Sequence, residues 1–413
     1  MKVEYKSYDE FIEACKVYFG DECEQCNGIC ELAEDNILCT IEKRSFDFIS
    51  LIVLRCKKCG TTFLPTYSKR TINYIYKTAV DNNKMSGRIS SSGYKKKFNY
   101  CIDNDFDYDY RDFYNIPGLC YNENSFEDGF LTPVYFEKEA LVYFFNVPDY
   151  EVEIFSESYG KFAKKDPSGL DLYEWNIQFG FNTNGRLVIW LGDIDKMDMK
   201  TREILKPFNI SSDHLLTDSD FYRAQIKCTF SEPIIEKQIL INKKAFISNI
   251  NKKYSIDLSH LTDECLQHER NVKRPVVYSE TTVGEVINAY DKILIEGFNI
   301  VKLKELYEEI YSPDERDKKY TNWKSIKLIE AILNKLSILI NNMDIALVIS
   351  PLYILHDYRN ILNHLLPADE IFEKKSHIAN TLGVKSFDDQ KTIYDKEIKG
   401  LNELFNYLAI LSK

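Results

Sequence analysis

Apolar residues recur at three- and four-residue intervals through most of the last third of the chain, which is the spacing of amphipathic helices. The pattern predicts helices over residues 283–306, 323–342, 345–366 and 394–411. Ser279 supplies helix-capping chemistry just before the first helix. Pro351 suits the first turn of the third helix, with Ser350 as its N-cap. The sequence therefore predicts an all-helical bundle over residues 276–413.

Upstream of this bundle, the pattern breaks into shorter segments with mixed preferences. Helical spacing covers residues 8–19 and 67–82, and between them lies the β-prone run 46–54. Residues 86–93 are rich in Ser and Gly and predict a flexible loop. We expect this loop to close an N-terminal region that spans residues 1–98.

The middle of the chain contains four runs of β-branched and aromatic residues that predict strands: 139–145, 150–155, 175–181 and 186–191. The sequence Asn-Thr-Asn-Gly at residues 182–185 joins the last two and predicts a hairpin, because Asn-Gly tolerates the positive φ of a tight turn. We expect the edge of a sheet there. The predicted fold class is thus multidomain α+β, with a mixed α/β domain over residues 99–275.

The composition supports several packed domains. Of the 413 residues, 44% are hydrophobic and 14% aromatic, which is enough for two or three cores and does not suggest disorder. No apolar run is long enough to span a bilayer, and residues 1–5 lack the apolar core of a signal peptide. We therefore expect a cytoplasmic protein. Its 11 Cys then indicate free thiols and a metal site, because disulfides do not persist in that compartment.

The most specific local signal is a pair of Cys-x2-Cys motifs, formed by Cys23, Cys26, Cys56 and Cys59. Four thiolates in two such turns satisfy tetrahedral Zn²⁺, and a pair of these turns joined by strands resembles a zinc ribbon. The metal would be structural, because four thiolates leave no open position for a substrate. Cys30 and Cys39 are possible substitute ligands; the alternative is that they are reduced, partly buried thiols.

The net charge of −11 disfavours a protein that coats nucleic acid through bulk electrostatics, so any RNA must be engaged locally. The best candidate surface is the stretch 69–97, where tyrosines lie between cations, a pattern that suits single-stranded or looped RNA because its bases can stack. Within it, the RNA-binding candidates are Lys95, Lys96 and Lys97. The alternative is a solvated helix face and loop.

Two acidic stretches could in principle hold a divalent cation. Carboxylates at residues 193–198 follow the predicted hairpin, with Asp213 and His214 a little further on. The competing interpretation is a capped turn in which Asp198 begins a helix. Residues 103–112 alternate acidic and aromatic side chains, which predicts an acidic edge strand or a polar loop.

The third predicted helix carries residues suited to catalysis. Its buried stripe is predicted to consist of Leu355, Tyr358, Leu362 and Leu365. Three polar residues lie off this stripe, namely Arg359, Asn360 and His364. Metal-free RNA cleavage needs a group with pKa near 7 to move protons and a planar cation to stabilise the phosphorane charge. The alternative is that Arg359 and His364 are ordinary solvated or capping residues.

The pattern Arg-Asn-x3-His, late in an all-helical segment, resembles the active motif of HEPN domains, many of which are ribonucleases of toxin and antiphage systems. The resemblance covers residues 282–413. It implies an up-and-down helical bundle that forms a homodimer, in which the motif helices of two protomers face each other across one composite site. It also implies that Arg359 and His364 are the catalytic pair and that Asn360 orients them.

The leading hypothesis is a metal-independent endoribonuclease that cleaves RNA by attack of the 2′-hydroxyl. The resemblance suggests a toxin or antiphage-defence effector, with a possible protein trigger or antitoxin partner. The alternative is a non-enzymatic nucleic-acid or protein-binding module that the helical domain dimerises. A third hypothesis, phosphoryl transfer by the carboxylates at residues 193–198, differs from the first because it requires a catalytic metal.

Overall fold

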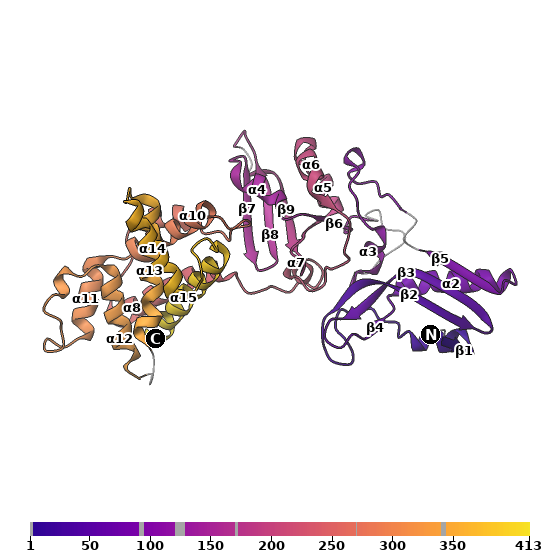
Figure 1. The fold of residues 1–413 in the computed structure, drawn as a ribbon, viewed down its shortest axis with the longest axis horizontal. Coiled ribbons are helices and arrows are strands. Elements are labelled where there is room, and N and C mark those ends of the chain that lie inside the picture. Colours follow the sequence, from indigo (N-terminus) through magenta and orange to yellow (C-terminus); the bar gives the residue numbers. More distant parts are fainter. Residues whose placement is uncertain (1–2, 91–94, 120–128, 170–171, 270, 340–343) are drawn as a thin grey trace. The chain divides into compact units, whose positions relative to one another are not determined.

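The computed structural model describes residues 3–90, 95–119, 129–169, 172–269, 271–339 and 344–413 (Figure 1). The chain forms two compact units, residues 1–232 and 233–413. The first unit is mixed α and β with two sheets, and the second is helical, in agreement with the expected α+β class. The helical unit begins at Pro233, upstream of the expected start at residue 276.

The first sheet has five strands, in the order β1-β2-β3-β4 with β5 paired to β3. The strands are β1 (Val3–Tyr5), β2 (Cys30–Ile41), β3 (Arg44–Cys56), β4 (Thr62–Phe63) and β5 (Ser86–Ser90). β2 and β3 form a long antiparallel hairpin, which contains the predicted strand 46–54. Phe46 and Phe48 of β3 pack in a core with side chains of the two helices of this region, α1 (Tyr8–Ala14) and α2 (Thr66–Asp81).

Strand β5 occupies the start of the segment that was predicted to be a flexible loop, and it runs parallel to β3. Gly87 allows the close approach, because a Cβ at this position would lie 3.0 Å from the Phe46 ring. Ile89 packs on the same core. The local preference of this segment for a strand is weak, so tertiary contacts are what make it a strand. Residues 91–93 of the predicted loop lie outside the described residues.

The second sheet has six strands, in the order β11-β6-β10-β9-β8-β7. The strands are β6 (Pro133–Phe136), β7 (Tyr150–Ser156), β8 (Tyr159–Lys165), β9 (Tyr173–Phe181), β10 (Leu187–Trp190) and β11 (Asn209–Ile210). The predicted hairpin is confirmed, because β9 and β10 pair antiparallel on either side of residues 182–185. Its predicted place at the sheet edge is wrong, because β10 also pairs with β6 and β9 with β8.

Short helices accompany this sheet: α3 (Tyr110–Asn115), α4 (Ala140–Asn146), α5 (Leu191–Asp195), α6 (Met199–Leu205) and α7 (Asp220–Gln225). Residues 139–145 were predicted to form a strand, but they form most of α4. Its buried residues are Ala140, Leu141 and Phe144. That set has helical spacing, which an almost entirely apolar run conceals in the sequence. The predicted helix start at Asp198 is confirmed, because its carboxylate accepts a hydrogen bond from the Thr201 amide.

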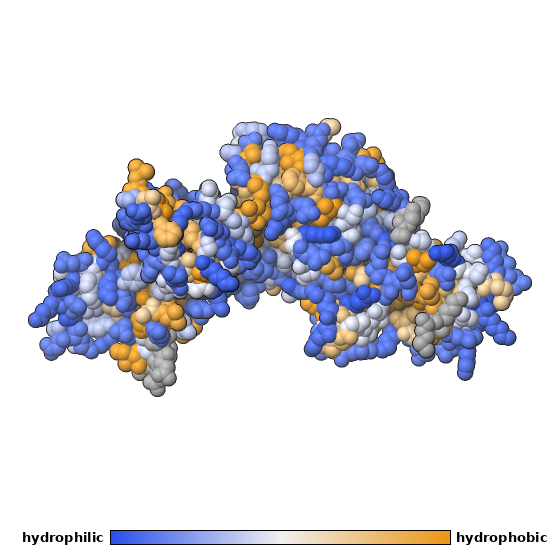
Figure 2. Space-filling view, in the orientation of Figure 1, coloured by the Kyte–Doolittle hydropathy of each residue, from blue (hydrophilic) through white to orange (hydrophobic). Residues whose placement is uncertain are grey.

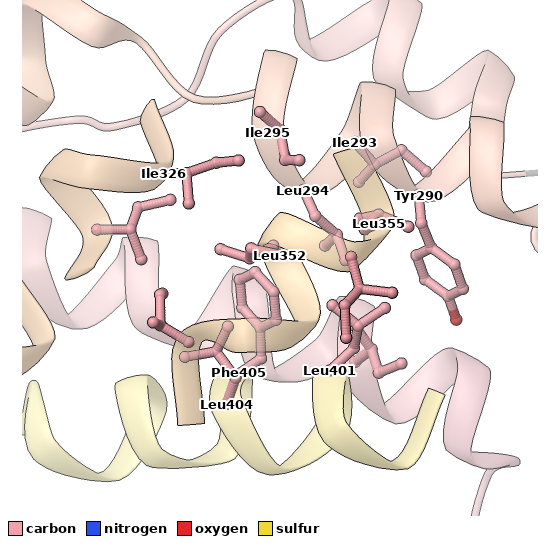
Figure 3. Close-up of a cluster of buried hydrophobic side chains, with 14 of the residues drawn as sticks. Tyr290, Ile293, Leu294, Ile295, Ile326, Leu352, Leu355, Leu401, Leu404 and Phe405 are labelled. Carbon is pink, nitrogen blue, oxygen red and sulfur yellow. The ribbon is translucent and has the colours of Figure 1, made fainter. Parts of the chain in front are cut away.

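The helical unit contains α8 (Ile235–Tyr254), α9 (Thr262–Glu269), α10 (Glu280–Asp291), α11 (Ile300–Ile310), α12 (Ser325–Leu336), α13 (Ile345–Asn363), α14 (Ala368–Thr381) and α15 (Gln390–Leu411). α13 packs against α10 and α15, and α8 packs against α15. Figure 3 shows buried side chains where these helices meet, including Leu294, Leu355 and Phe405. α8 lies in the segment assigned to the middle domain, and α14 was not predicted.

The stretch 283–306 was predicted to be one helix, but the structure interrupts it. After α10 the backbone forms a π-helical turn at Lys292–Glu296. α11 then begins separately, with the Asn299 side chain accepting hydrogen bonds from the first turn. The predicted cap at Ser279 is confirmed, because Ser279 and Thr282 form a capping box at the start of α10. The last residues of the predicted helix 323–342, from residue 340 onward, lie outside the described residues.

The N-terminal end of α13 also differs from the prediction. Asp344, not Ser350, is the N-cap, and Pro351 lies inside the helix. Gly400 of α15 accommodates the proline ring, because a Cβ on Gly400 would lie 2.6 Å from Pro351 Cγ. A close contact between two helices therefore stabilises a proline position that the sequence alone disfavours.

One buried acid in this unit gives a prediction about stability. Glu397 of α15 is fully buried, and neither carboxyl oxygen has a hydrogen-bond partner among the described residues. Burial raises the pKa of Glu397 well above its usual value of 4.5. The unfolded chain therefore loses this proton at a lower pH than the folded chain. As the pH rises above the pKa of the unfolded chain, the carboxyl lowers the free energy of unfolding by an increasing amount.

We expect Glu397→Met to increase the free energy of unfolding by about 1–3 kcal/mol at neutral pH, because it removes a buried polar group without a partner. The gain should be larger at pH 8 than at pH 5, as urea unfolding would show. Glu236→Met is a matched comparison, since Glu236 is equally buried but accepts hydrogen bonds from Arg274 and Tyr394. That variant should lose stability. A less stable Glu397→Met protein would contradict the argument.

Polar residues cover most of the face seen in Figure 2, with apolar residues in small patches. Among the residues that the structure describes, no helix is both long and apolar enough to cross a membrane.

Candidate metal centre and arginine–histidine site

The structure brings the four predicted cysteines together, namely Cys23, Cys26, Cys56 and Cys59. Sγ of Cys23 lies 3.6 Å from Sγ of Cys59, and Sγ of Cys26 lies 3.5 Å from Sγ of Cys56. In a tetrahedral site with Zn–S bonds of about 2.3 Å, neighbouring sulfurs would be roughly 3.8 Å apart. The cluster therefore has the size and donor set of a four-thiolate metal site.

The local sequence explains how the two turns form. Each turn closes with a backbone hydrogen bond, from the Asn27 amide to the Cys23 carbonyl (2.8 Å) and from the Gly60 amide to the Cys56 carbonyl (3.0 Å). Gly60 has φ of 74°, which favours glycine. A Cβ on Gly28 would lie 3.0 Å from Cys56 Sγ, so this glycine lets the first turn approach the sulfurs of the second.

Cys30 and Cys39 lie outside the cluster. Cys30 is opposite Cys56 in the β2–β3 pairing, and Cys39 lies nearer the other end of β2, in the core with Phe11. Burial raises the pKa of both thiols to about 12, so both are neutral thiols at physiological pH. This placement agrees with the interpretation of Cys30 and Cys39 as reduced, buried thiols.

A buried carboxylate next to this cluster joins β2 to the segment between β11 and α7. Glu31 follows Cys30 on β2 and is 4% exposed. Its carboxylate accepts hydrogen bonds from three successive backbone amides, those of Leu216 (3.0 Å), Thr217 (2.8 Å) and Asp218 (2.9 Å). The fold of the cysteine region therefore supports the segment that leads into α7.

The structure also brings together the predicted residues of α13. Arg359 Nη1 lies 3.5 Å from His364 Nε2 and 3.4 Å from Asn360 Oδ1. His364 is exposed and is the C-cap of α13, so the helix ends at Asn363, four residues before Pro367. Leu365 was predicted to lie in the buried stripe but is fully exposed, because it follows the end of the helix.

Two carboxylates that sequence reasoning missed flank the guanidinium. Arg359 Nε lies 3.4 Å from Oδ2 of Asp291, which is completely buried, and Arg359 Nη2 lies 3.0 Å from Oε1 of the exposed Glu296. Asp291 ends α10 and Glu296 ends the π-helical turn. Residues five apart would point about 140° apart in an α-helix, but i→i+5 bonding in a π-turn aligns them. No sequence signal near the motif indicates these distant residues.

A second imidazole belongs to the same group. His356 Nδ1 lies 3.1 Å from Asp291 Oδ1, and this hydrogen bond to the carboxylate raises the pKa of His356. The buried Asp291 carboxylate thus holds both His356 and Arg359 on one side of α13. In the sequence, the three-residue spacing of His356 and Arg359, which places both on one side of a helix, was the signal for this arrangement.

Lys243 of α8 binds the backbone at the π-helical turn. Its ammonium donates hydrogen bonds to the carbonyls of Ile293 (2.8 Å) and Gly297 (3.4 Å) and lies over the Phe298 ring. Burial lowers the pKa of Lys243 to about 8. These bonds join the π-helical turn to α8.

The candidate RNA-binding lysines have partners within the first unit. Lys95 Nζ lies 3.2 Å from Asp107 Oδ1, Lys97 pairs with Asp105, and Lys96 contacts the Tyr114 hydroxyl and the rings of Phe98 and Tyr114. The alternating acidic segment thus forms a polar loop that leads into α3 and neutralises two of these cations. Tyr94, part of the proposed basic surface, lies outside the described residues.

The carboxylates at residues 193–198 do not gather around His214. Instead, Asp193 pairs with Lys196, and Asp198 caps α6. His214 Nδ1 lies 2.7 Å from Asp112 Oδ1, a carboxylate from the other acidic stretch. The interpretation of residues 193–198 as a capped turn is therefore the better one.

Comparison with family models, curated proteins and solved structures gives no match to this chain. The residues of this chain define a two-unit protein, with a four-cysteine cluster in one unit and, in the other, a partly buried arginine beside an exposed histidine.

Proposed function

We propose that this protein is a metal-independent endoribonuclease of the HEPN type. The observation that carries the proposal is the approach of Arg359 Nη1 to His364 Nε2, 3.5 Å apart at the exposed end of α13. A guanidinium and an imidazole at this separation can contact the same phosphate group. The buried carboxylate of Asp291 further supports the proposal, because it lies at ion-pair distance from Arg359 Nε (3.4 Å) and keeps the guanidinium charge at this place.

The proposed reaction uses the RNA itself as nucleophile. The 2′-oxygen attacks the adjacent phosphorus, the bond from phosphorus to the 5′-oxygen breaks, and a 2′,3′-cyclic phosphate and a 5′-hydroxyl result. His364 moves a proton at the 2′-oxygen or the leaving oxygen, and Arg359 stabilises the charge on the phosphorane. In a two-fold dimer, the two copies of His364 would supply one base and one acid. Asn360 would orient the pair.

The charge around Arg359 determines how a phosphate can approach. Asp291 is buried and remains paired with the guanidinium, whereas the Glu296 side chain is 51% exposed and can move away. A phosphate would therefore replace Glu296 on Nη2 while Asp291 holds Nε. Lys95 and Lys97 could contribute to RNA binding only after release from Asp107 and Asp105.

We further propose that the four clustered cysteines bind one Zn²⁺ as a structural ion. Four thiolates suit tetrahedral zinc and leave no open position for a substrate. The ion would hold the two turns together and stabilise the first unit, so it takes no part in RNA cleavage.

The Arg-Asn-x3-His motif of α13 suggests the biological setting. We propose a toxin or antiphage effector, with a protein trigger or antitoxin as partner.

The second candidate is a non-enzymatic binding module, and one observation favours it. In the single chain, Arg359 already pairs with two carboxylates, which lowers its capacity to bind a phosphate. An assay with purified protein and cellular RNA separates the two functions. Cleavage that persists with a chelator and leaves 5′-hydroxyl ends supports the nuclease. Ends with a 5′-phosphate, or activity lost upon chelation while the cysteine site keeps its zinc, would place catalysis elsewhere.

The proposed dimer gives a separate prediction. Two exposed apolar side chains follow the motif, Leu365 (fully exposed) and Phe372 (72% exposed). If two motif helices face each other, these side chains are suited to the contact. We expect a Leu365→Glu/Phe372→Glu protein to become monomeric in light scattering and to lose cleavage without unfolding. Val301→Glu is the matched control, because Val301 is equally exposed (72%) on α11. A wild-type protein that stays monomeric at micromolar concentration would contradict the dimer.

A further inference from the structure

A polar cavity of about 250 Å³ lies in the first unit. Its lining comes from β2, the start of α3 and the segment after β11. Three of the lining residues place potential metal-ligand atoms within 4.8 Å of one another, namely Glu34, Asp109 and His214. These residues have no part in the proposed RNA cleavage and are distinct from the cysteine cluster.

The imidazole of His214 is held in a fixed orientation. Its Nδ1 lies 2.7 Å from Oδ1 of Asp112, which is completely buried, and Oδ2 of Asp112 accepts a hydrogen bond from the Ser212 hydroxyl at 2.6 Å. Nε2 lies 3.9 Å from Glu34 Oε1, which is too far for a hydrogen bond. A carboxylate that holds the other ring nitrogen is the arrangement that orients histidines bound to metals.

Carboxylates outnumber cations around the cavity. Three carboxylates meet here, those of Glu34, Asp109 and Asp112, and the guanidinium of Arg111 pairs with the first two. Lys95 also lines the cavity, but it pairs with Asp107, a fourth carboxylate. With neutral His214, the described groups therefore carry two excess negative charges. A protonated His214 would balance one of them, whereas a divalent cation would balance both.

We propose that Glu34, Asp109 and His214 bind one divalent metal ion, with Asp112 as the carboxylate that orients the imidazole. A site with two carboxylates and one imidazole suits Mn²⁺. The ion would share the two carboxylates with Arg111. Three protein ligands leave positions open toward the cavity, where water or an oxygen of an anionic ligand can bind.

Titration of the full-length, zinc-loaded protein with Mn²⁺ tests this site, because zinc first fills the cysteine cluster. Electron paramagnetic resonance of free Mn²⁺ should show one bound equivalent. Glu34→Gln and His214→Asn should each weaken binding at least tenfold, and Asp112→Asn by about 10–100-fold. Asp103→Asn is the matched control, since Asp103 is an exposed carboxylate of the same acidic segment. Its affinity should be unchanged.

Two results would overturn the proposal. One is the absence of Mn²⁺ binding at millimolar concentration, together with only one equivalent of zinc per chain, which would mean that the site binds no divalent ion. The other is unchanged binding in Glu34→Gln and His214→Asn proteins. The Glu34 side chain is 38% exposed, so its substitution by Gln should leave folding intact and keep the test decisive. Circular dichroism verifies folding of each variant.

Discussion

Replacement of His364 by alanine should reduce RNA cleavage by about 10²–10⁴-fold, because it removes proton transfer in the transition state. His364 is exposed and caps the end of α13, so the variant should fold normally. The rate of cleavage of a defined RNA, measured under single-turnover conditions with equal amounts of folded protein, is the relevant quantity. A variant that cleaves within twofold of wild type would show that His364 is not catalytic.

Substitutions at Arg359 should separate catalysis from stability. Its side chain is only 21% exposed and pairs with the buried Asp291. Arg359→Ala should therefore lose both cleavage and stability, since the buried carboxylate keeps its hydrogen bond with His356 but loses the guanidinium charge. Arg359→Lys keeps the charge and should recover stability but only part of the activity, because an ammonium cannot reproduce the planar fork. Glu296→Gln is the control: it removes the competing carboxylate, so cleavage should be at least as fast as in wild type.

The Cys56→Ser protein should lose its bound zinc and much of the stability of the first unit. Metal binding contributes directly to the folding free energy when the site exists only in the folded state, by about 10–16 kcal/mol in zinc-finger peptides. We expect one equivalent of zinc in the wild-type protein by elemental analysis, and none in the variant. Because Glu31 joins the cysteine region to residues 216–218, limited proteolysis should cut the first unit while the helical unit persists.

Cys39→Ser is the matched control for this experiment. Cys39 is as buried as Cys56 but lies outside the cluster, so the variant should keep one equivalent of zinc. Zinc lost from both variants would mean that unfolding, not ligation, controls the metal content. Wild-type protein without zinc, after purification that avoids chelators, would contradict the proposed site.

Much of the secondary structure could be predicted because its causes are local. The pairing of β9 with β10 follows from Asn184-Gly185, which accepts the backbone angles of the turn. The Cys-x2-Cys turns depend on glycines within a few residues of the thiols. The errors occur where local preference is weak or ambiguous: a fully apolar run became α4, and Ser-Gly-rich residues became β5 by pairing with β3.

In the candidate sites, too, some features follow from the local sequence and others only from the tertiary structure. The sequence by itself determined the two Cys-x2-Cys turns and which residues of α13 share one side, since spacing along the chain sets both, whereas the pairing of β2 with β3 brings the two turns together. Only the tertiary structure placed Asp291 and Glu296 beside Arg359, and Asp112 beside His214. These partners are separated by about 60–100 residues along the chain. Their approach depends on a π-helical turn in one unit and on the packing of two sheets in the other, and no periodic pattern in the sequence encodes either.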